Sequence, residues 1–221
     1  MLLIAGILAV PAPALDRLDF SVAGGDDGLE KTVRAASLLL TQQADGATDP
    51  QDLFAAARAD YARILGALYA KGHYSAVISI RIDGREAAGI APLNAPGRIG
   101  TITVSVDPGP PFAFSRAEIA PLPPETRLPE DFRPGKPAYS TAISGALDEA
   151  TLAWREAGYP KVATGAEDIV ADHARSTLAA DIRLAPGPKL RFGPLTVTLS
   201  LIHISEPTRR TPISYAVFCL K

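Results

Sequence analysis

The sequence is poor in the residues that build disulfide frameworks, metal cages and nucleic-acid surfaces. It contains one cysteine, Cys219, and three histidines, so we expect neither a disulfide nor a cysteine-based metal site. Lysine and arginine together number 22 against 24 aspartates and glutamates, which gives a net charge of −2. Because no basic stripe is present to attract a phosphate backbone, the sequence argues against a nucleic-acid partner.

Residue constellations typical of catalysis are also missing from the sequence. His73 and His173 lie far apart, and Glu167 and Asp168 are neighbours in an expected strand, so their side chains point to opposite faces. The glycine-rich segment 84–100 is not followed by the Lys-Ser/Thr pair of a phosphate-binding loop. We therefore predict that the chain is not an enzyme and uses no cofactor and no metal.

Proline and glycine are abundant instead, with 20 and 18 residues. They fall between stretches of regular hydrophobic periodicity rather than inside them, which favours several short modules joined by turns. Hydrophobic residues make up 47% of the chain and charged residues 21%. This composition is sufficient for packed cores and is unlike that of a disordered tail.

The N-terminus indicates export. Residues 1–10 form an uncharged apolar run, and Pro11-Ala12-Pro13-Ala14 follows. The run is shorter than the ~20 apolar residues that span a bilayer, and with the Ala-x-Ala site it resembles a secretory signal peptide. No lysine or arginine precedes it, and the alternative is the start of a buried strand or helix. We favour residues 1–14 as a signal peptide.

The C-terminal segment 199–221 differs in kind from the rest of the chain. Residues 199–209 resemble the in-frame translation of one half of a transposase-end sequencing adapter, and residues 213–220 resemble the other half in the same order. We therefore exclude 199–221 from the reasoning about the fold. We also expect the natural gene to continue beyond Thr198.

The remaining chain contains an internal repeat. Residues 68–74 (LYAKGHY) match 153–159 (AWREAGY): each is the end of an amphipathic helix, then a glycine, then an aromatic residue that begins a strand. Further on, Pro108-Gly109-Pro110 matches Pro186-Gly187-Pro188, and a phenylalanine-containing strand is expected after each. The repeat predicts two units, residues 15–108 and 109–187, and the first strand of a third in 188–198.

The first unit has the predicted order strand, helix, helix, strand, strand. Asp26 or Asp27 can cap the first helix, and Asp49 followed by Pro50 begins the second. A polar loop is expected at 41–48. Alternating apolar residues predict strands at 18–22, 74–82 and 102–106.

The second unit follows the same order less clearly. Ser140 is predicted to cap a helix that turns Trp154 inward, and a proline-rich connection precedes it at 123–133. Strands are predicted at 114–119, 161–170 and 177–184.

A βααββ unit of this size, repeated in tandem behind a signal sequence, resembles the POTRA domain. The helix-Gly-Tyr segments at Gly72 and Gly158 and the Pro-Gly-Pro junctions at Gly109 and Gly187 carry the resemblance, which covers about residues 15–197. It implies an α+β fold in which each module is a small mixed three-stranded sheet covered on one face by two helices. Within the POTRA-bearing proteins the chain is most similar to the TamA family, the barrel subunits of the translocation and assembly module.

The resemblance also implies a function and partners. The chain would be the periplasmic scaffold of an outer-membrane β-barrel assembly and autotransporter translocation factor, anchored to the outer membrane through a barrel beyond Thr198. It would bind unfolded outer-membrane protein clients and a TamB-like subunit anchored in the inner membrane. The resemblance implies β-augmentation at the second strand of each unit, with Ala76, Ile78, Ile80, Val162 and Thr164 as the predicted partner-binding strand edge.

Two alternatives remain open at this stage. The first is the POTRA region of BamA or of a two-partner-secretion transporter, which the number of modules before the barrel would distinguish from TamA. The second is a secreted hydrolase with a βα fold, which is disfavoured because no catalytic constellation is present.

Overall fold

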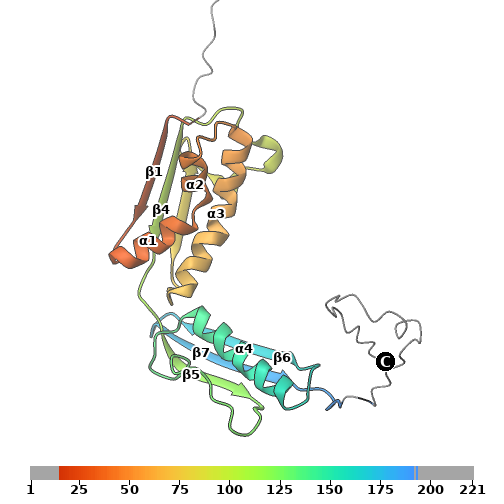
Figure 1. Cartoon of the computed structure of the whole chain (residues 1–221). Helices are drawn as coiled ribbons and strands as arrows, with labels where there is room; N and C mark the ends of the chain where they lie inside the picture. The colour runs from red at the N-terminus through yellow and green to blue at the C-terminus, as the bar shows by residue number, and fades with distance from the viewer. Residues whose placement is uncertain (1–14, 192, 194–221) are drawn as a thin grey trace, which may run out of the picture. The chain divides into compact units, whose positions relative to one another are not determined.

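A computed structural model of the chain describes residues 15–191 and 193 (Figure 1). The chain divides into two units, 1–189 and 190–221, and all the helices and strands named below belong to the first. The predicted signal peptide (1–14), the adapter-like segment (199–221) and nearly all of the strand predicted at 192–197 lie outside the described residues.

The first sheet has four strands in the order β1-β4-β2-β3. Strand β1 pairs with β4 in parallel, whereas β2 pairs with β4 and β3 in antiparallel fashion. Three helices lie on one face of this sheet (Figure 1). In chain order the elements are β1 (Arg17–Val22), α1 (Asp27–Ala36), α2 (Leu38–Ala44), α3 (Pro50–Ala70), β2 (Val77–Ile82), β3 (Arg85–Glu86) and β4 (Thr101–Asp107).

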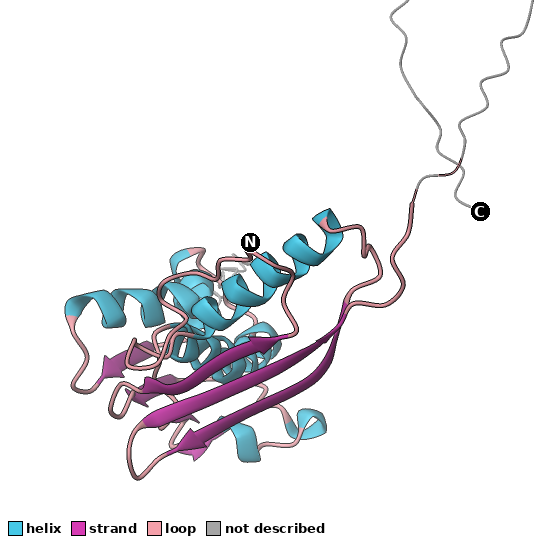
Figure 2. Ribbon diagram, turned by 90° about the horizontal axis from the view of Figure 1, so that it is seen from below, coloured by secondary structure: helices cyan, strands magenta, loops and turns pink. Residues whose placement is uncertain are grey.

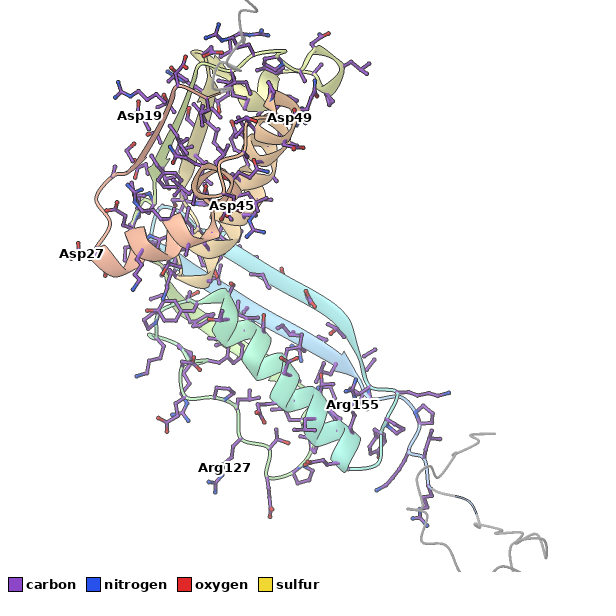
Figure 3. The ribbon with its side chains drawn as sticks, turned by 45° about the horizontal axis from the view of Figure 1, so that its top comes forward. Asp19, Asp27, Asp45, Asp49, Arg127 and Arg155 are labelled. Atoms are coloured by element: carbon purple, nitrogen blue, oxygen red, sulfur yellow. The ribbon has the colours of Figure 1, made fainter. Side chains whose placement is uncertain are left out.

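The helix starts follow the local sequence. The Asp26 carboxylate accepts the Leu29 N–H at 2.6 Å and caps α1, and Asp49 accepts the Gln51 N–H at 2.7 Å and caps α3. Figure 3 shows Asp49 at the start of α3. A carboxylate here satisfies an N–H that has no partner inside the helix, and Pro50 has no N–H to lose.

The core of the first sheet lies between its strands and α1, α2 and α3. Its fully buried members include Val33, Leu39, Leu53, Ile64, Leu68, Ile80, Ile102 and Val104. One charged residue is buried with them: Asp60 of α3 is 0% exposed. Its carboxylate accepts hydrogen bonds from the Ser37 hydroxyl at 2.6 Å, the Leu38 N–H at 2.7 Å and the Leu39 N–H at 3.3 Å. Asp60 therefore ties the beginning of α2 to α3.

The second sheet has three strands in the order β5-β7-β6. Its elements are β5 (Ala113–Ala120), α4 (Ser140–Glu156), β6 (Ala163–Asp172) and β7 (Thr177–Ala185). Strand β7 pairs in parallel with β5 and in antiparallel fashion with β6. Helix α4 covers one face (Figures 1 and 2), and the core between them includes Phe114, Ile143, Ala146, Leu178, Ala180 and Ile182.

The repeat predicted from the sequence has the same backbone geometry in both copies. The Gly72 N–H donates to Tyr69 and the His73 N–H to Leu68, and the Gly158 and Tyr159 N–H groups make the equivalent bonds to Arg155 and Trp154. Both glycines have positive φ, 78° and 94°, as a Schellman helix end requires. A Cβ at Gly109 would lie 3.1 Å from the Ser75 carbonyl oxygen, and one at Gly187 would lie 3.5 Å from that of Lys161. Ser75 and Lys161 each follow the helix-ending glycine by three residues.

The mixed α+β fold is confirmed, but the first sheet has four strands rather than the predicted three, and the number of helices per sheet differs from the prediction of two. The described residues place three helices on the first sheet and one on the second. The extra helix, α2, occupies part of the predicted polar loop at 41–48, because Ser37 caps it and Asp60 holds its first N–H groups. The proline-rich segment 121–138 forms turns rather than a second helix over β5-β7-β6.

Two local predictions are also corrected. Ser140 is the first residue of α4 rather than its cap, because Tyr139 takes the cap position without a side-chain hydrogen bond. The segment 83–98, whose glycines and prolines are typical of a loop, contains β3 and two short 3₁₀ turns, Ala87–Gly89 and Pro92–Asn94. The module boundaries at 108 and 187 stay predictions.

Candidate strand-edge interface

The five residues predicted at the strand edge lie on or beside β2 and β6. Ile78 and Ile80 belong to β2, and Ala76 precedes it by one residue. Thr164 belongs to β6, whereas Val162 precedes that strand. Strand β6 extends to Asp172, two residues beyond the predicted end of this strand. The predicted edge residues are thus divided between two different sheets.

On β2, alternate residues direct their main-chain groups towards or away from β4. The Ile80 N–H and carbonyl both contact side chains on the side away from β4. The Asp83 N–H, by contrast, donates to the carbonyl of Thr101, the first residue of β4. By the alternation of an antiparallel ladder, the main-chain groups of Ile78 also face away from β4, whereas those of Ser79 face it. Strand β3 pairs only with Arg81 and Ile82, so it ends before it reaches Ile78.

Ile80 has no free N–H at this edge. Its N–H donates to Glu86 Oε1 at 3.0 Å and lies 3.3 Å from Tyr61 Oη. Val162 is similar in this respect: its N–H donates to the Tyr159 carbonyl at 3.2 Å, and its side chain is 7% exposed. Of the five predicted residues, Ala76, Ile78 and Thr164 lie where an added strand could meet unoccupied main-chain groups.

Strand β6 is the outer strand of the second sheet and pairs only with β7 in the described part of the chain. The Ser176 carbonyl, at the start of β7, accepts the Ala113 N–H from the β5 side. Alternation along β7 therefore directs its odd-numbered residues towards β6, where they face Asp168, Val170 and Asp172. It follows that Glu167, Ile169 and Ala171 present their N–H and carbonyl groups at the outer edge.

The β6 edge is long and its side chains are exposed. Its first eight residues, 163–170, are all exposed, and the large apolar side chains of Ile169 and Val170 are 44% and 55% exposed. Ile169 lies on the face that carries α4, opposite the core residue Ala180, whereas Val170 lies on the open face. Folded proteins generally shorten, charge or cover such edges because they pair readily with another chain. Glu167 and Asp168 are the only charges in residues 163–171.

Sequence periodicity located β6, but a single alternation does not continue along the whole strand. The register shifts between Thr164 and Ala166, where Gly165 is an additional residue. A β-bulge of this kind exchanges the two edges of a strand, so the alternation counted from Val162 does not reach Ile169. The isolated glycine in a strand pattern was the available signal for the bulge.

A pocket of about 360 Å³ lies beside the last residues of β6. Ile169 and Ala171 line it together with Ile143 of α4, Tyr69 and Tyr74. The two tyrosine rings stack with centroids 4.9 Å apart, and the Tyr74 hydroxyl donates to the Ala138 carbonyl at 2.8 Å. Burial, with the neighbouring Tyr69, raises the pKa of Tyr74 to about 12. Tyr74 is therefore a neutral hydrogen-bond donor at physiological pH.

The open face of the second sheet carries balanced charges. Arg116 of β5 contacts Asp181 of β7 at 3.1 Å and Glu118 at 2.7 Å, and Arg183 contacts Asp181 at 3.0 Å. These pairs are largely exposed and contribute little to stability. Because the acidic and basic groups alternate, this face is not a surface that selects an anion or a cation.

The described residues contain no group of three histidine, cysteine, aspartate or glutamate side chains arranged to hold a metal ion. His73 Nδ1 lies 3.0 Å from the Gly109 carbonyl and His173 Nδ1 lies 2.9 Å from Ser75 Oγ. Each histidine has a local hydrogen-bond partner. Among the described helices none combines the length and the apolar character needed to cross a bilayer.

Similarity between this chain and known proteins is found among solved structures. No protein-family description and no curated protein sequence matches the chain. The chain is similar in structure to POTRA domains 3–5 of BamA from Haemophilus influenzae, with 16% sequence identity, 85% of this chain and 73% of that chain covered, and a TM-score of 0.48.

Two further similar structures come from Anabaena. Against POTRA domains 1–3 of the Omp85 periplasmic domain the identity is 15%, the coverage 78% of this chain and 61% of that chain, and the TM-score 0.42. Against POTRA domains 1–2 of the same protein the identity is 16%, the coverage 79% of this chain and 95% of that chain, and the TM-score 0.40. At these values none of the three assigns the chain to a family.

Proposed function

We propose that this chain is a tandem POTRA region that acts in the periplasm, at the outer membrane, as a scaffold for outer-membrane protein assembly. It binds extended segments of unfolded clients, or of a partner subunit, by β-augmentation. The observation that carries the proposal is the β6 edge, which is ten residues long, pairs on one side only in the described chain, and is exposed along its first eight residues.

The chemistry of a strand edge suits this role. An added strand is held by main-chain hydrogen bonds, which depend weakly on the side chains of the client. The groups that we assign to this pairing are the main-chain N–H and carbonyl groups of Glu167, Ile169 and Ala171, with Thr164 before the bulge. The pocket at Ile169 and Ala171 would accept an apolar side chain of the added strand.

A more specific form of the proposal follows from the TamA resemblance. In this form the partner subunit is TamB-like and the clients include autotransporters. Two features of the first repeat favour TamA: the long segment between β2 and β4, which includes β3 and the two 3₁₀ turns, and the sequence RAASL at 34–38.

The experiment that tests the proposal removes one outward N–H from β6. Ile169→Pro deletes the N–H that we assign to the partner and spares the β7 ladder, since proline is tolerated where the N–H of an edge strand faces solvent. Ile169→Ala is the matched control because it shortens the side chain and keeps the N–H. The probe is a fluorescent peptide of about ten residues that alternates valine and threonine, like a barrel strand.

We expect the wild-type chain and Ile169→Ala to bind the peptide with affinities within roughly threefold. Ile169→Pro should bind at least about tenfold more weakly, since a main-chain bond is lost and the proline ring stands where the partner's carbonyl would approach. Fluorescence anisotropy measures all three affinities. Equal binding by Ile169→Pro, in a variant whose circular dichroism matches the wild type, would refute pairing at β6.

A further inference from the structure

The β2 edge is the second place at which a strand could be added to this chain. Strand β3 pairs with Arg81 and Ile82 and then ends, and the 3₁₀ turn Ala87–Gly89 follows. An incoming strand could continue the line of β3 along Ile80, Ile78 and Ala76. The two sheets therefore offer one edge each, on β2 and on β6. The two edges differ in the groups that occupy their main-chain donors and acceptors.

The Glu86 side chain occupies the β2 edge. Its Oε1 accepts the Ile80 N–H at 3.0 Å, and its Oε2 accepts the Ser79 hydroxyl at 2.8 Å. Glu86 is the last residue of β3. Its carboxylate therefore binds the Ile80 N–H, which would form the next hydrogen bond if the β2–β3 ladder continued. A charged acceptor on a main-chain N–H is a stronger partner than the neutral carbonyl of an incoming strand.

Tyr61 of α3 holds Glu86 in this position. The Tyr61 hydroxyl donates to Glu86 Oε1 and lies 3.2 Å from the Ile80 carbonyl. Partial burial opposes ionisation of Glu86, but hydrogen bonds from Tyr61, Ser79 and Ile80, together with Arg81, outweigh it and hold the pKa of Glu86 below its usual range. The ionised carboxylate, which is the form that accepts the Ile80 N–H, is therefore favoured.

The β6 edge has no comparable occupant. Among the hydrogen bonds of the described chain, none joins a side chain to the main chain of Glu167, Ile169 or Ala171. The two edges thus differ in accessibility although both belong to the second long strand of a repeat. Side chains that satisfy an edge are a recognised way for a sheet to avoid unwanted pairing.

We propose that Glu86, positioned by Tyr61, closes the β2 edge and confines strand addition to β6. Glu86 and Tyr61 are thus the residues that determine which of the two sheets receives an extended partner. The inference rests on the proposed function, since it concerns the site at which β-augmentation takes place. It predicts that removal of the carboxylate creates a second strand-addition site on the first sheet.

The test is residue-resolved amide exchange of the full chain with and without the alternating valine-threonine peptide. Three chains are compared: the wild type, Glu86→Ala, and Glu156→Ala, which removes an exposed carboxylate at the end of α4 and controls for net charge. In Glu86→Ala, saturating peptide should slow exchange at Ile78 and Ile80 by roughly tenfold or more, the factor expected for a new ladder bond. In the wild type and in Glu156→Ala, the Ile78 amide should not respond.

A graded variant keeps the test valid if Glu86→Ala folds poorly. Glu86→Gln preserves the side-chain length and removes the charge, and should give a smaller slowing at Ile78 in the same direction. Tyr61→Phe, which leaves the carboxylate in place but unsupported, should also give a smaller effect than Glu86→Ala.

The outcomes at β2 and β6 are read separately. Slowing at Ile78 in Glu86→Ala without slowing at Ile169 in any chain supports the role of Glu86 and contradicts the proposed function at β6. Slowing at Ile169 in every chain without slowing at Ile78 overturns the role of Glu86 and leaves the proposed function standing. Slowing at Ile78 already in the wild type overturns the role of Glu86, as does the absence of any response in Glu86→Ala.

Discussion

Asp60 is the buried residue whose removal should loosen the attachment of α2 to α3. The side chain is 0% exposed and accepts three hydrogen bonds, at 2.6, 2.7 and 3.3 Å. Two of the donors are N–H groups at the beginning of α2, which have no partner within that helix. Asp60→Ala would leave the Ser37 hydroxyl and both N–H groups without their acceptor.

The expected loss follows from the two short bonds. A hydrogen bond to a charged group contributes about 1.5–3 kcal/mol, and an abandoned buried donor costs about 1–3 kcal/mol. Part of this is recovered because the variant no longer buries a carboxylate. We therefore expect Asp60→Ala to lower the free energy of unfolding by about 3 kcal/mol, and Asp60→Asn, which keeps one acceptor oxygen, by about half as much.

The assay is urea unfolding followed by circular dichroism, with amide exchange to locate the change. Exchange should accelerate in α2 and at the facing turns of α3. The control is Asp52→Ala, an exposed aspartate in the first turn of the same helix, which should cost less than about 1 kcal/mol. A loss below 1 kcal/mol for Asp60→Ala would refute the assignment of Asp60 as the anchor of α2.

Two further predictions concern the segments that flank β2 and β5. Burial raises the pKa of Tyr74 to about 12, so the folded chain holds this proton at pH values where the unfolded chain has lost it. Stability should therefore fall as the pH rises from about 10 to 12. Ultraviolet titration should show a late tyrosine ionisation that Tyr74→Phe removes. A titration in which every tyrosine ionises near pH 10 would contradict the burial. Gly109 has a φ of 63°, and a Cβ there would lie 3.1 Å from the Ser75 carbonyl oxygen. Gly109→Ala should therefore lower the free energy of unfolding by about 1–3 kcal/mol. The control is Gly84→Ala, because Gly84 has a φ of 82° but open space around the Cβ, which separates the backbone strain from the close contact.

The features that the sequence predicted well are local ones. Asp49 and Pro50 mark the start of α3 because the capping bond joins residues two positions apart. The glycines at 72 and 158 mark helix ends for a similar reason, since their positive φ is needed within one turn of the helix. The alternation of Ile78, Ile80 and Ile82 located β2, because side chains of one face of a strand share one environment.

The features that the sequence did not reveal depend on residues far apart in the chain. Helix α2 needs Asp60, which is separated from Ser37 by 23 residues. Closure of the β2 edge needs Tyr61, 25 residues before Glu86. The bulge at Gly165 altered the phase of β6, and periodicity alone does not indicate which strand register follows a bulge. Periodicity therefore located the strand and Thr164 before the bulge, but not the outward-facing positions after it.

The central claim is that extended partners add to the outer edge of β6, and the most direct measurement is the exchange rate of successive β6 amides with and without the alternating peptide. The account predicts protection of every second amide, at Glu167, Ile169 and Ala171, with Asp168 and Val170 unchanged because β7 already protects them. A uniform change along β6, or protection confined to residues outside it, would contradict strand addition at this edge.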